Sequence, residues 1–483
     1  MFLLIWNFSD WKELNLILSK KLKYAGLIVL LLLVAGIVGH YFAMGYLYDF
    51  DVAADYRYNF INNKNVMNSL PVKVDKDHFI LPKISDDWDT GLLRVDIKSS
   101  FFGKVFAPYI EVSCQGKQYN QYFEYGAKGT RYINISHLSH AASSRIALKG
   151  HHLSWDVQDS QFFLFKNPKI ADKKILVIAP HPDDAEIAAF GLYSYKNSYV
   201  LTVTDGSTGA AKYEKYFYGT DKESSYGMVA KLRVIDSLTV PVMGGVAQQN
   251  CYNLAYFAET LKTMNSAPVV DVKNKYSGQL DNMPLRKLNI PSLPHDSRPN
   301  WQSLVSDLVY VLNVIKPDII VTPHPLLDSN LDHQFSTHAV FEAMKKAKLS
   351  SDGKLYLYSN HYILGRSCQS GPQGSMTSLP PLFSDIKFSS IYSYEIPQNV
   401  LTEKTFALDA MHDLRPLPYR INISTAAFIS NTFHALVDYL RNGTEFDLSY
   451  YRKALKANEL FYVYPFMDAA EIGSAKMQSD RLQ

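Results

Sequence analysis

Buried strands alternate with amphipathic helices after residue 172, and this alternation limits the fold more than any other feature. The apolar run KKILVIAP leads into HPDD and then into the helical pattern EIAAFGLYSY. The strand YVLTVTDG is followed by the amphipathic pattern SYGMVAKLRVIDSL, and the strand PDIIVTPHP is preceded by WQSLVSDLVYVLNVIK. Because strands that alternate with helices pair in parallel, we predict a Rossmann-like, doubly wound, mostly parallel α/β sheet over residues 172–470.

One stretch inside this region is less regular. Residues 247–300 are rich in Asn, Pro and Ser and read as an irregular insertion, while VPVMGG just before them reads as a short strand. Long loops in compact domains often form lids or rims of a site, so the insertion is a candidate for that role. Residues 471–483 read as a C-terminal tail.

Residues 50–168 have an all-β pattern. Short apolar runs such as GLLRVDIKS and PYIEVSCQG recur between clusters of Gly, Asn, Asp and Ser, and Leu93, Val95 and Ile97 alternate with a period of two. This spacing predicts a β-sandwich-like domain. Such modules often carry sugar-binding faces, but a fold does not give a function, so binding and packing roles both stay open.

A long apolar run lies near the N-terminus, from Tyr24 to Tyr46. At ~1.5 Å per residue it spans roughly 35 Å as a helix, which is enough to cross a bilayer. Lysines precede the run and aspartates follow it. The positive-inside rule therefore predicts a cytoplasmic segment 1–23, a single transmembrane helix 24–47, and a chain that continues on the extracytoplasmic (periplasmic or cell-surface) side.

Composition excludes several other classes of protein. A chain of 483 residues is too long for one compact core, and its net charge of +3 gives no general attraction to nucleic acid, which we do not expect as a partner. The three cysteines, Cys114, Cys251 and Cys368, form no CxxC pair. A cysteine zinc site is therefore not expected.

Polar residues with metal-ligand chemistry follow two of the buried strands. His181 and Asp184 stand three apart on a turn that leads from a strand into a helix, and Asp183 lies between them. Asp332 and His333 come after another strand. Because ligands bind outside the carboxyl ends of strands in open α/β sheets, His181, Asp184 and His333 can converge on one metal ion. A lone HPDD would equally suit a helix N-cap, and the second histidine segment favours the metal site.

These segments resemble one known family, the PIG-L/LmbE-like deacetylases. ILVIAPHPDDAEIAAFG is similar to the family's acidic signature, LTVTDGSTG to its second strand and glycine turn, and PDIIVTPHPLLDSNLDHQFSTHAV to its second metal segment. Arg233 with Asp236 resembles its Arg-x-x-Glu helix, and KTFALDAMHD resembles its late Lys-x-x-Ala-Leu helix. The resemblance covers about residues 172–465, with the insertion as a gap, and leaves out the apolar run and the β region.

The resemblance implies a zinc-dependent N-deacetylase that acts on N-acetylated sugars, often of the N-acetylglucosamine type. It implies that His181, Asp184 and His333 bind one Zn²⁺ per chain, that Asp183 is the general base, and that Arg233 contacts the substrate. Together with the predicted anchor, it implies a membrane-bound hydrolase that acts on an extracytoplasmic glycan, polysaccharide or glycolipid. Iron and manganese stay open as alternatives, because mixed nitrogen and oxygen sites accept several metals.

The sequence departs from the family pattern at two places. Ala185 stands where a Glu usually follows the Asp pair, and Asn330 stands where the family often has a His that assists catalysis. An Asn can donate a hydrogen bond to an oxyanion but cannot give a proton to the leaving amine. Either Asp183 shuttles that proton, or another histidine gives it, or activity is reduced. His324 and His361 are the candidate histidines, and both are also candidates for substrate contact.

Two other functions stay open from the sequence. Asn330 is compatible with a catalytically weak, membrane-anchored glycan-binding or assembly protein that keeps the deacetylase fold. Hydrolysis of another amide or of an ester at the same metal is also chemically possible. The sequence fixes neither the sugar nor the oligomeric state.

Overall fold

A computed structural model of the chain describes most of its residues. The described residues are 21–32, 34–36, 48, 50–61, 67–83, 87–138, 144–208, 221–291, 293, 297–362, 371–384, 386–414 and 454–474.

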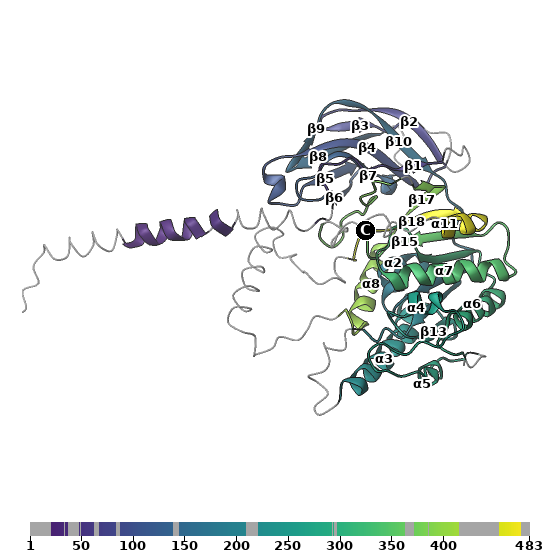
Figure 1. The fold of residues 1–483 in the computed structure, drawn as a ribbon. Helices are drawn as coiled ribbons and strands as arrows, with labels where there is room; N and C mark the ends of the chain where they lie inside the picture. The colour runs from purple at the N-terminus through teal and green to yellow at the C-terminus, as the bar shows by residue number, and fades with distance from the viewer. Residues whose placement is uncertain are drawn as a thin grey trace, which may run out of the picture.

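A seven-stranded mixed sheet forms the centre of the C-terminal part (Figure 1). Its strand order is β13-β12-β11-β14-β15-β18-β17, and neighbours from β13 to β15 pair in parallel while β18 pairs antiparallel with both β15 and β17. The predicted mixed α/β content is confirmed. The strand bounds are β11 Ile175–Ala179, β12 Ser198–Thr204, β13 Cys251–Tyr256, β14 Ile319–Pro323, β15 Lys354–Tyr358, β17 Ser390–Glu395 and β18 Asn458–Pro465.

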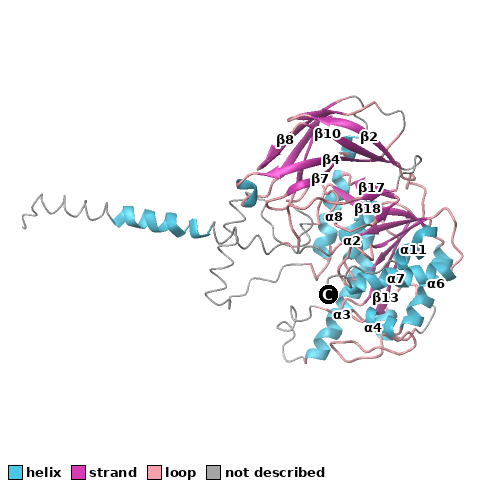
Figure 2. Cartoon of the chain, turned by 45° about the horizontal axis from the view of Figure 1, so that its top comes forward, coloured by secondary structure: helices cyan, strands magenta, loops and turns pink. Residues whose placement is uncertain are grey.

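Helices cover both faces of this sheet (Figure 2). In β11, Leu176 and Ile178 pack into one apolar core, and Ile175 and Val177 into another. Successive strand residues point to opposite faces, so a strand that is apolar throughout needs a cover on each side. The helices are α2 Asp184–Tyr193, α3 Lys222–Thr239, α4 Leu261–Ser266, α5 Met283–Arg286, α6 Trp301–Ile315, α7 Leu331–Lys346, α8 Gln398–Ala410 and α11 Ala469–Ser474.

The β part is a nine-stranded antiparallel sheet with the order β6-β5-β8-β3-β2-β10-β4-β7, to which β9 adds beside β4. We expected two packed sheets, but strand pairing joins all nine strands into one sheet. β3 pairs with both β8 and β2, and β10 pairs with both β2 and β4, so no break separates two sheets. Its apolar side chains form a core of their own. The strands are β2 Met67–Val74, β3 His78–Ile80, β4 Thr90–Ser99, β5 Tyr109–Cys114, β6 Lys117–Tyr122, β7 Lys128–Asn134, β8 Arg145–His151, β9 Leu153–Trp155 and β10 Gln158–Phe165.

The β part packs against the edge of the central sheet (Figure 1). Asn134 Nδ2 donates to Ser393 Oγ at 2.8 Å, and Asn167 Nδ2 donates to the carbonyl of Ile391 at 2.9 Å, both on β17. Two short strands, β1 Asn59–Phe60 and β16 Lys387–Phe388, also pair in parallel. The two parts therefore share buried contacts, while the domain boundaries at 50–168 and 172–470 stay predictions.

The predicted membrane anchor is wrong. The structure describes helix at residues 21–32 and 34–36, and residues 1–20 and 37–47 lie outside the described part. Among described residues, no helix is both long and apolar enough to cross a membrane, which removes the support for a single-pass protein with an extracytoplasmic catalytic domain.

The supposed insertion contains a strand of the central sheet. This strand, β13, lies at the edge of the sheet. The sequence did not predict it, because its pattern, CYNLAY, includes a buried polar residue, Asn253. Two hydrogen bonds compensate for the burial of Asn253. Its backbone N–H donates to Asn289 Oδ1 at 2.8 Å, and its side-chain Nδ2 donates to Ser237 Oγ at 2.8 Å. The segment Val240–Gly244, expected as a strand, is a 3₁₀ turn with Pro241 in its first positions.

Candidate metal centre

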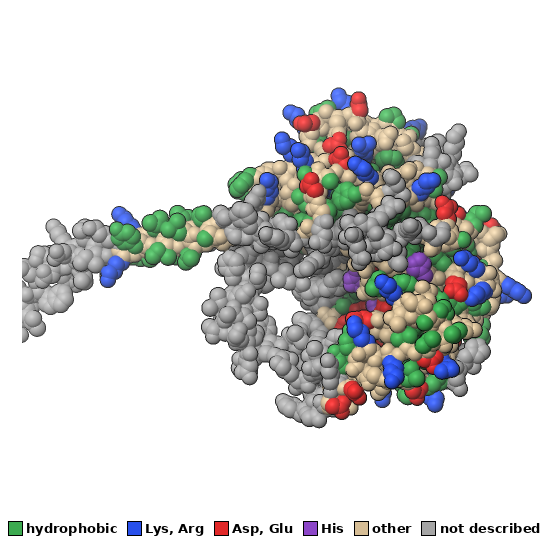
Figure 3. All heavy atoms as spheres, in the orientation of Figure 1, with side chains coloured by type: hydrophobic (Ala, Val, Ile, Leu, Met, Phe, Trp, Pro, Cys, Tyr) green, Lys and Arg blue, Asp and Glu red, His purple; other side chains and the backbone are tan. Residues whose placement is uncertain are grey.

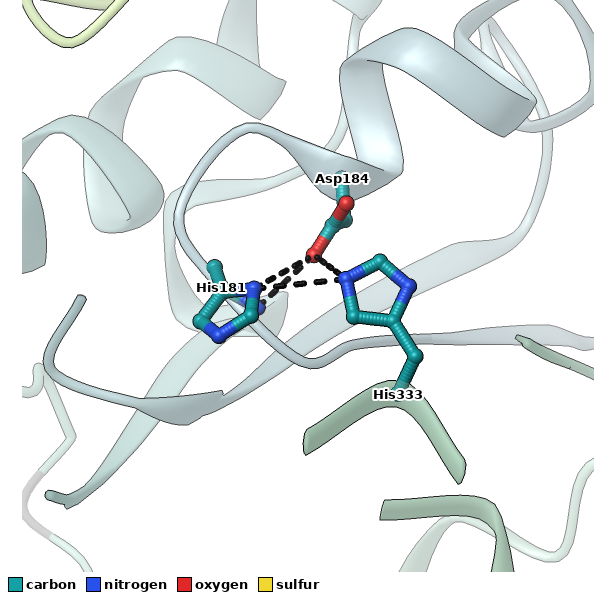
Figure 4. A group of neighbouring side chains, drawn as sticks. All are labelled: His181, Asp184 and His333. Atoms are coloured by element: carbon teal, nitrogen blue, oxygen red, sulfur yellow. Dashed lines mark hydrogen bonds and ion pairs between the residues drawn. The ribbon is translucent and has the colours of Figure 1, made fainter. Parts of the chain in front are cut away.

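Three predicted ligand residues meet at the carboxyl edge of the central sheet (Figure 4). His181 follows β11, Asp184 is the first residue of α2, and His333 lies in the first turn of α7. Asp184 Oδ2 lies 3.2 Å from His181 Nδ1 and 3.0 Å from His333 Nε2, and the two ring nitrogens are 3.3 Å apart. The side chains therefore converge on one point from segments about 150 residues apart.

The spacing of these atoms fits a small divalent metal. Zinc bonds to nitrogen and oxygen of about 2.0–2.1 Å in a tetrahedron place neighbouring ligand atoms roughly 3.3 Å apart. The three observed separations lie close to that value. Two imidazoles and one carboxylate form a donor set that leaves coordination positions for water or substrate. The residues present thus fit a metal ion of this kind.

Further side chains hold each candidate ligand in place. Asp332 Oδ2 lies 3.1 Å from His181 Nε2, and Asp328 Oδ2 lies 3.0 Å from His333 Nδ1. Asn360 Nδ2 donates to Asp184 Oδ1 at 2.7 Å. Carboxylates behind metal-binding histidines fix the ring orientation and raise the basicity of the ligand. Sequence reasoning missed Asp328 and Asn360 as orienting residues; their position beyond β14 and β15 was the one available signal.

The cluster attracts positive charge. Burial lowers the pKa of His181, but hydrogen bonds to Asp184 and Asp332 outweigh burial and raise the pKa to about 9. Burial raises the pKa of Asp184, yet His333 and His181 hold it well below its ordinary value. Both pKa shifts show that the carboxylates at this site stabilise a positive charge beside them. A bound metal ion would supply such a charge.

Asp183, the predicted base, lies beside this cluster in a strained conformation. Its φ is 137°, a region that side chains other than glycine rarely adopt. Its burial raises the pKa of the carboxyl to about 7, while the Arg233 guanidinium, 3.3 Å away, opposes the rise. A buried carboxylate with a pKa near neutrality suits proton transfer.

Arg233, which we expected to contact the substrate, is buried, and its guanidinium donates to the Asp183 carboxylate. Its side chain is 3% exposed. The guanidinium donates to the carbonyl of Gly206 at 2.7 Å and to that of Pro182 at 2.9 Å. Gly206 has a φ of +63°, and a Cβ there would come within 2.9 Å of the guanidinium. Through these contacts Arg233 holds the Pro182–Asp183 turn, and its contact with a substrate stays a prediction.

The structure separates the three remaining candidates. Asn330 caps α7, and its Oδ1 accepts from the backbone N–H of Asp332 at 2.9 Å. His324 is fully buried among aromatic rings, including Tyr462 and Tyr464, so no substrate reaches it. His361 is exposed, and its ring centroid lies 4.9 Å from that of His333. Figure 3 shows histidine side chains at the surface between the β part and the helices, with acidic side chains beside them.

Comparison with protein families identifies one part of the chain. Residues 176–344 match the family model described as PIG-L, GlcNAc-PI de-N-acetylase. This segment belongs to the PIG-L family. No curated protein matches the chain.

Solved structures similar to this chain include three enzymes. N,N'-diacetylchitobiose deacetylase from Pyrococcus horikoshii has 16% identity and a TM-score of 0.33, over 62% of this chain and 86% of that one. The 4-carboxy-2-hydroxymuconate hydratase GalB from Pseudomonas putida has 12% identity and a TM-score of 0.32, over 60% and 95%. The zinc-inhibited form of teicoplanin deacetylase Orf2 has 13% identity and a TM-score of 0.32, over 60% and 98%. Similarities of this size carry no functional argument.

The PIG-L segment holds the three converging residues and Asp183. Asn360 and His361, which lie at the same site, come after it in sequence. The candidate site therefore also contains residues that lie outside the matched segment.

Proposed function

We propose that this protein is a zinc-dependent N-deacetylase that removes acetyl groups from N-acetylated amino sugars. The observation that carries the proposal is the convergence of His181 Nδ1, Asp184 Oδ2 and His333 Nε2 within 3.3 Å of one another. The description of the matched family, a de-N-acetylase of a GlcNAc compound, supports the substrate class.

His181, Asp184 and His333 would hold the metal. When bound there, Zn²⁺ would lower the pKa of water and polarise an amide carbonyl. Asp183 accepts a proton from the water that attacks the carbonyl carbon. As the C–N bond breaks, that proton passes to the nitrogen, and the products are acetic acid, which ionises, and a free amine.

The surrounding residues keep this arrangement in place. Arg233 holds Asp183 in place, because its guanidinium contacts the Asp183 carboxylate and also the carbonyls of Pro182 and Gly206. His361 is the exposed side chain beside His333, and we assign it the hydrogen bond to the reacting amide. This assignment takes the place of the role first considered for Asn330, whose side-chain oxygen caps α7.

Acetate release tests the proposal. The purified protein, loaded with zinc, is incubated with N-acetylglucosamine oligosaccharides, and acetate and metal content are measured. We expect acetate from the wild-type protein, none after metal removal, none from Asp183→Asn with its zinc retained, and loss of zinc from His181→Ala. A zinc-loaded wild-type protein that releases no acetate, or a fully active Asp183→Asn variant, would overturn the proposed function.

A further inference from the structure

A short segment of the irregular insertion, residues 257–261, contacts the carboxylate that orients His181. The backbone N–H of Glu259 donates to Asp332 Oδ2 at 2.5 Å, and the backbone N–H of Leu261 donates to Asp332 Oδ1 at 3.4 Å. Asp332 Oδ2 in turn lies 3.1 Å from Nε2 of His181. The insertion therefore reaches a candidate metal ligand through one carboxylate.

The backbone around this segment adopts an unfavourable conformation. Ala255 has a φ of 54° and Glu259 a φ of 60°, in the left-handed region that favours glycine. Residues with a side chain persist there only where contacts with the surrounding structure hold them. The backbone N–H of Ala255 donates to Asn253 Oδ1 at 2.7 Å, and that of Glu259 donates to Asp332. The direction of the Glu259 N–H thus depends on contacts from outside the segment.

Asp205 ties the segment to the central sheet. This residue directly follows β12 and is fully buried. Its Oδ1 accepts from the backbone N–H of Ala258 at 3.1 Å, and its own N–H donates to the carbonyl of Tyr256 at 2.7 Å. Because Ala258 directly precedes Glu259, the two contacts fix the chain immediately before the N–H that holds Asp332.

A second part of the insertion meets the same carboxylate. Asn274 is buried, and its Nδ2 lies 3.5 Å from Asp205 Oδ2 and donates to Ser207 Oγ at 2.9 Å. Burial raises the pKa of Asp205 to about 6, although hydrogen bonds from the backbone of Ser207 and Ala258 oppose the rise. At pH 7 the carboxyl is therefore mostly ionised and only accepts hydrogen bonds.

We propose that Asp205 is a positioning residue for the metal ligand His181, and this inference rests on the proposed function. The Asp205 carboxylate holds the N–H of Ala258, and the next N–H along the chain, that of Glu259, holds Asp332. Asp332 then holds the ring of His181. Partners of the second ring nitrogen contribute to metal affinity, so the insertion takes part in metal binding although His181, Asp184 and His333 lie outside it.

Two other roles for Asp205 predict something different. If the residue only stabilised the fold, its loss would weaken zinc binding independently of Asp332. If it acted through Gly206, whose carbonyl binds Arg233, its loss would disturb Asp183 and would again be independent of Asp332. Independent effects on affinity multiply, whereas two residues that act in series do not add their losses.

The experiment is a double-mutant cycle on zinc affinity in the full-length protein, measured by competition with a chromogenic chelator. Asp205→Ala removes the acceptor of the Ala258 N–H and should lower zinc affinity about tenfold. Asp205→Asn keeps an acceptor oxygen and should bind zinc nearly as the wild type does. The double variant Asp205→Ala/Asp332→Ala should bind zinc as weakly as Asp332→Ala alone.

The matched control is Asp318→Ala. Asp318 Oδ2 also accepts from a backbone N–H, that of Lys174 at 2.8 Å, but the pair precedes β14 and β11 at the opposite edge of the sheet. This variant loses the same kind of hydrogen bond and should keep the zinc affinity of the wild type. Urea denaturation shows that each variant is folded; if Asp205→Ala is not, Asp205→Glu, which keeps the charge and displaces the oxygens, replaces it in the cycle.

Unchanged zinc affinity in the folded Asp205 variant, or losses that multiply with that of Asp332→Ala, would overturn the inference, whatever the result for acetate release. A wild-type protein that binds no zinc contradicts the proposed function instead. NMR of histidine-labelled, metal-free protein then decides the inference. The Nε2–H signal of His181, assigned by its loss in His181→Ala, should exchange with water faster in Asp205→Ala, and unchanged exchange contradicts the positioning role.

Discussion

Asp332 contacts His181 on the side of the imidazole that points away from the candidate metal centre, with Asp332 Oδ2 3.1 Å from Nε2 of the ring. The other ring nitrogen, Nδ1, is the one that points to Asp184 and His333. Asp332 is itself fixed, because it accepts hydrogen bonds from the backbone N–H groups of Glu259 and Leu261. The pair therefore fixes the angle of the ring and holds a proton on Nε2, which leaves Nδ1 as the nitrogen that would bind a metal.

We expect Asp332→Asn to lower zinc affinity by about 10- to 100-fold, because the His181 ring loses its orienting charge. Competition with a chromogenic chelator measures the affinity directly. Asp352→Asn, an exposed change on the loop before β15, is the control and should bind zinc like the wild type. Unchanged affinity in Asp332→Asn would show that His181 does not need this partner.

His361 provides a second test, because it lies at the site and yet is exposed. We expect His361→Ala to lower kcat/KM for acetate release by about 100-fold, the usual range for a lost proton-transfer or hydrogen-bonding group. Zinc content should stay at the wild-type value, since the contact with His333 is between ring faces and edges. His78→Ala on β3 is the control, and a His361→Ala variant within twofold of wild-type activity would refute the assignment.

A substitution at Gly206 tests whether Arg233 holds Asp183 in place. A Cβ at this position would lie 2.7 Å from Pro182 Cδ and 2.9 Å from Arg233 Cζ, and the φ of +63° is itself unfavourable for alanine. We expect Gly206→Ala to lower the free energy of unfolding by about 1–3 kcal/mol and to reduce turnover, because Arg233 must move.

The matched control for this change is Gly227→Ala on α3. No atom lies within 4 Å of a Cβ built there, and alanine is the better helix former. Its free energy of unfolding should rise by about 0.5–1 kcal/mol with unchanged turnover. Urea denaturation and acetate release measure both effects; equal behaviour of the two variants would show that Gly206 is not a close-contact position.

The convergence of His181, Asp184 and His333 could be predicted from the sequence because its signals are local. The spacing of His181 and Asp184 on a strand-to-helix turn, and the place of His333 after another strand, follow from chain order alone. The orienting role of Asp328 and Asn360 could not be predicted, since it depends on the separation of β14 and β15 in space. Asn330 could have been interpreted as the N-cap of α7, for which Asn is a preferred residue.

Sequence could not separate His324 from His361, because each follows a buried strand. The backbone N–H of His324 still bonds to the carbonyl of Tyr358, so the chain there continues the sheet ladder and the ring turns into the aromatic core. His361 stands beyond the end of β15, where the ladder has ended and the side chain reaches the surface. The difference lies in strand register, which single-sequence patterns do not contain.

The buried ring of His324 makes a prediction about acid stability. Burial lowers its pKa to about 3, so the folded protein keeps it neutral where the unfolded chain, with a pKa near 6.5, is protonated. The contribution of His324 to the free energy of unfolding is fully present above pH 6.5 and is lost progressively as the pH falls toward 3. At pH 5 the free energy of unfolding is lower by about 2 kcal/mol for this reason.

His324→Asn removes this titration and keeps an acceptor for the backbone N–H of Leu326, which donates to His324 Nδ1 at 3.2 Å. The variant should be less stable than the wild type at pH 7.5, since it loses aromatic packing, by about 1–3 kcal/mol. Between pH 7.5 and pH 5 it should lose about 2 kcal/mol less than the wild type does. Urea denaturation at both pH values measures the difference, with His78→Asn as the surface control. Parallel losses in wild type and variant would mean that His324 becomes protonated without unfolding the core around it.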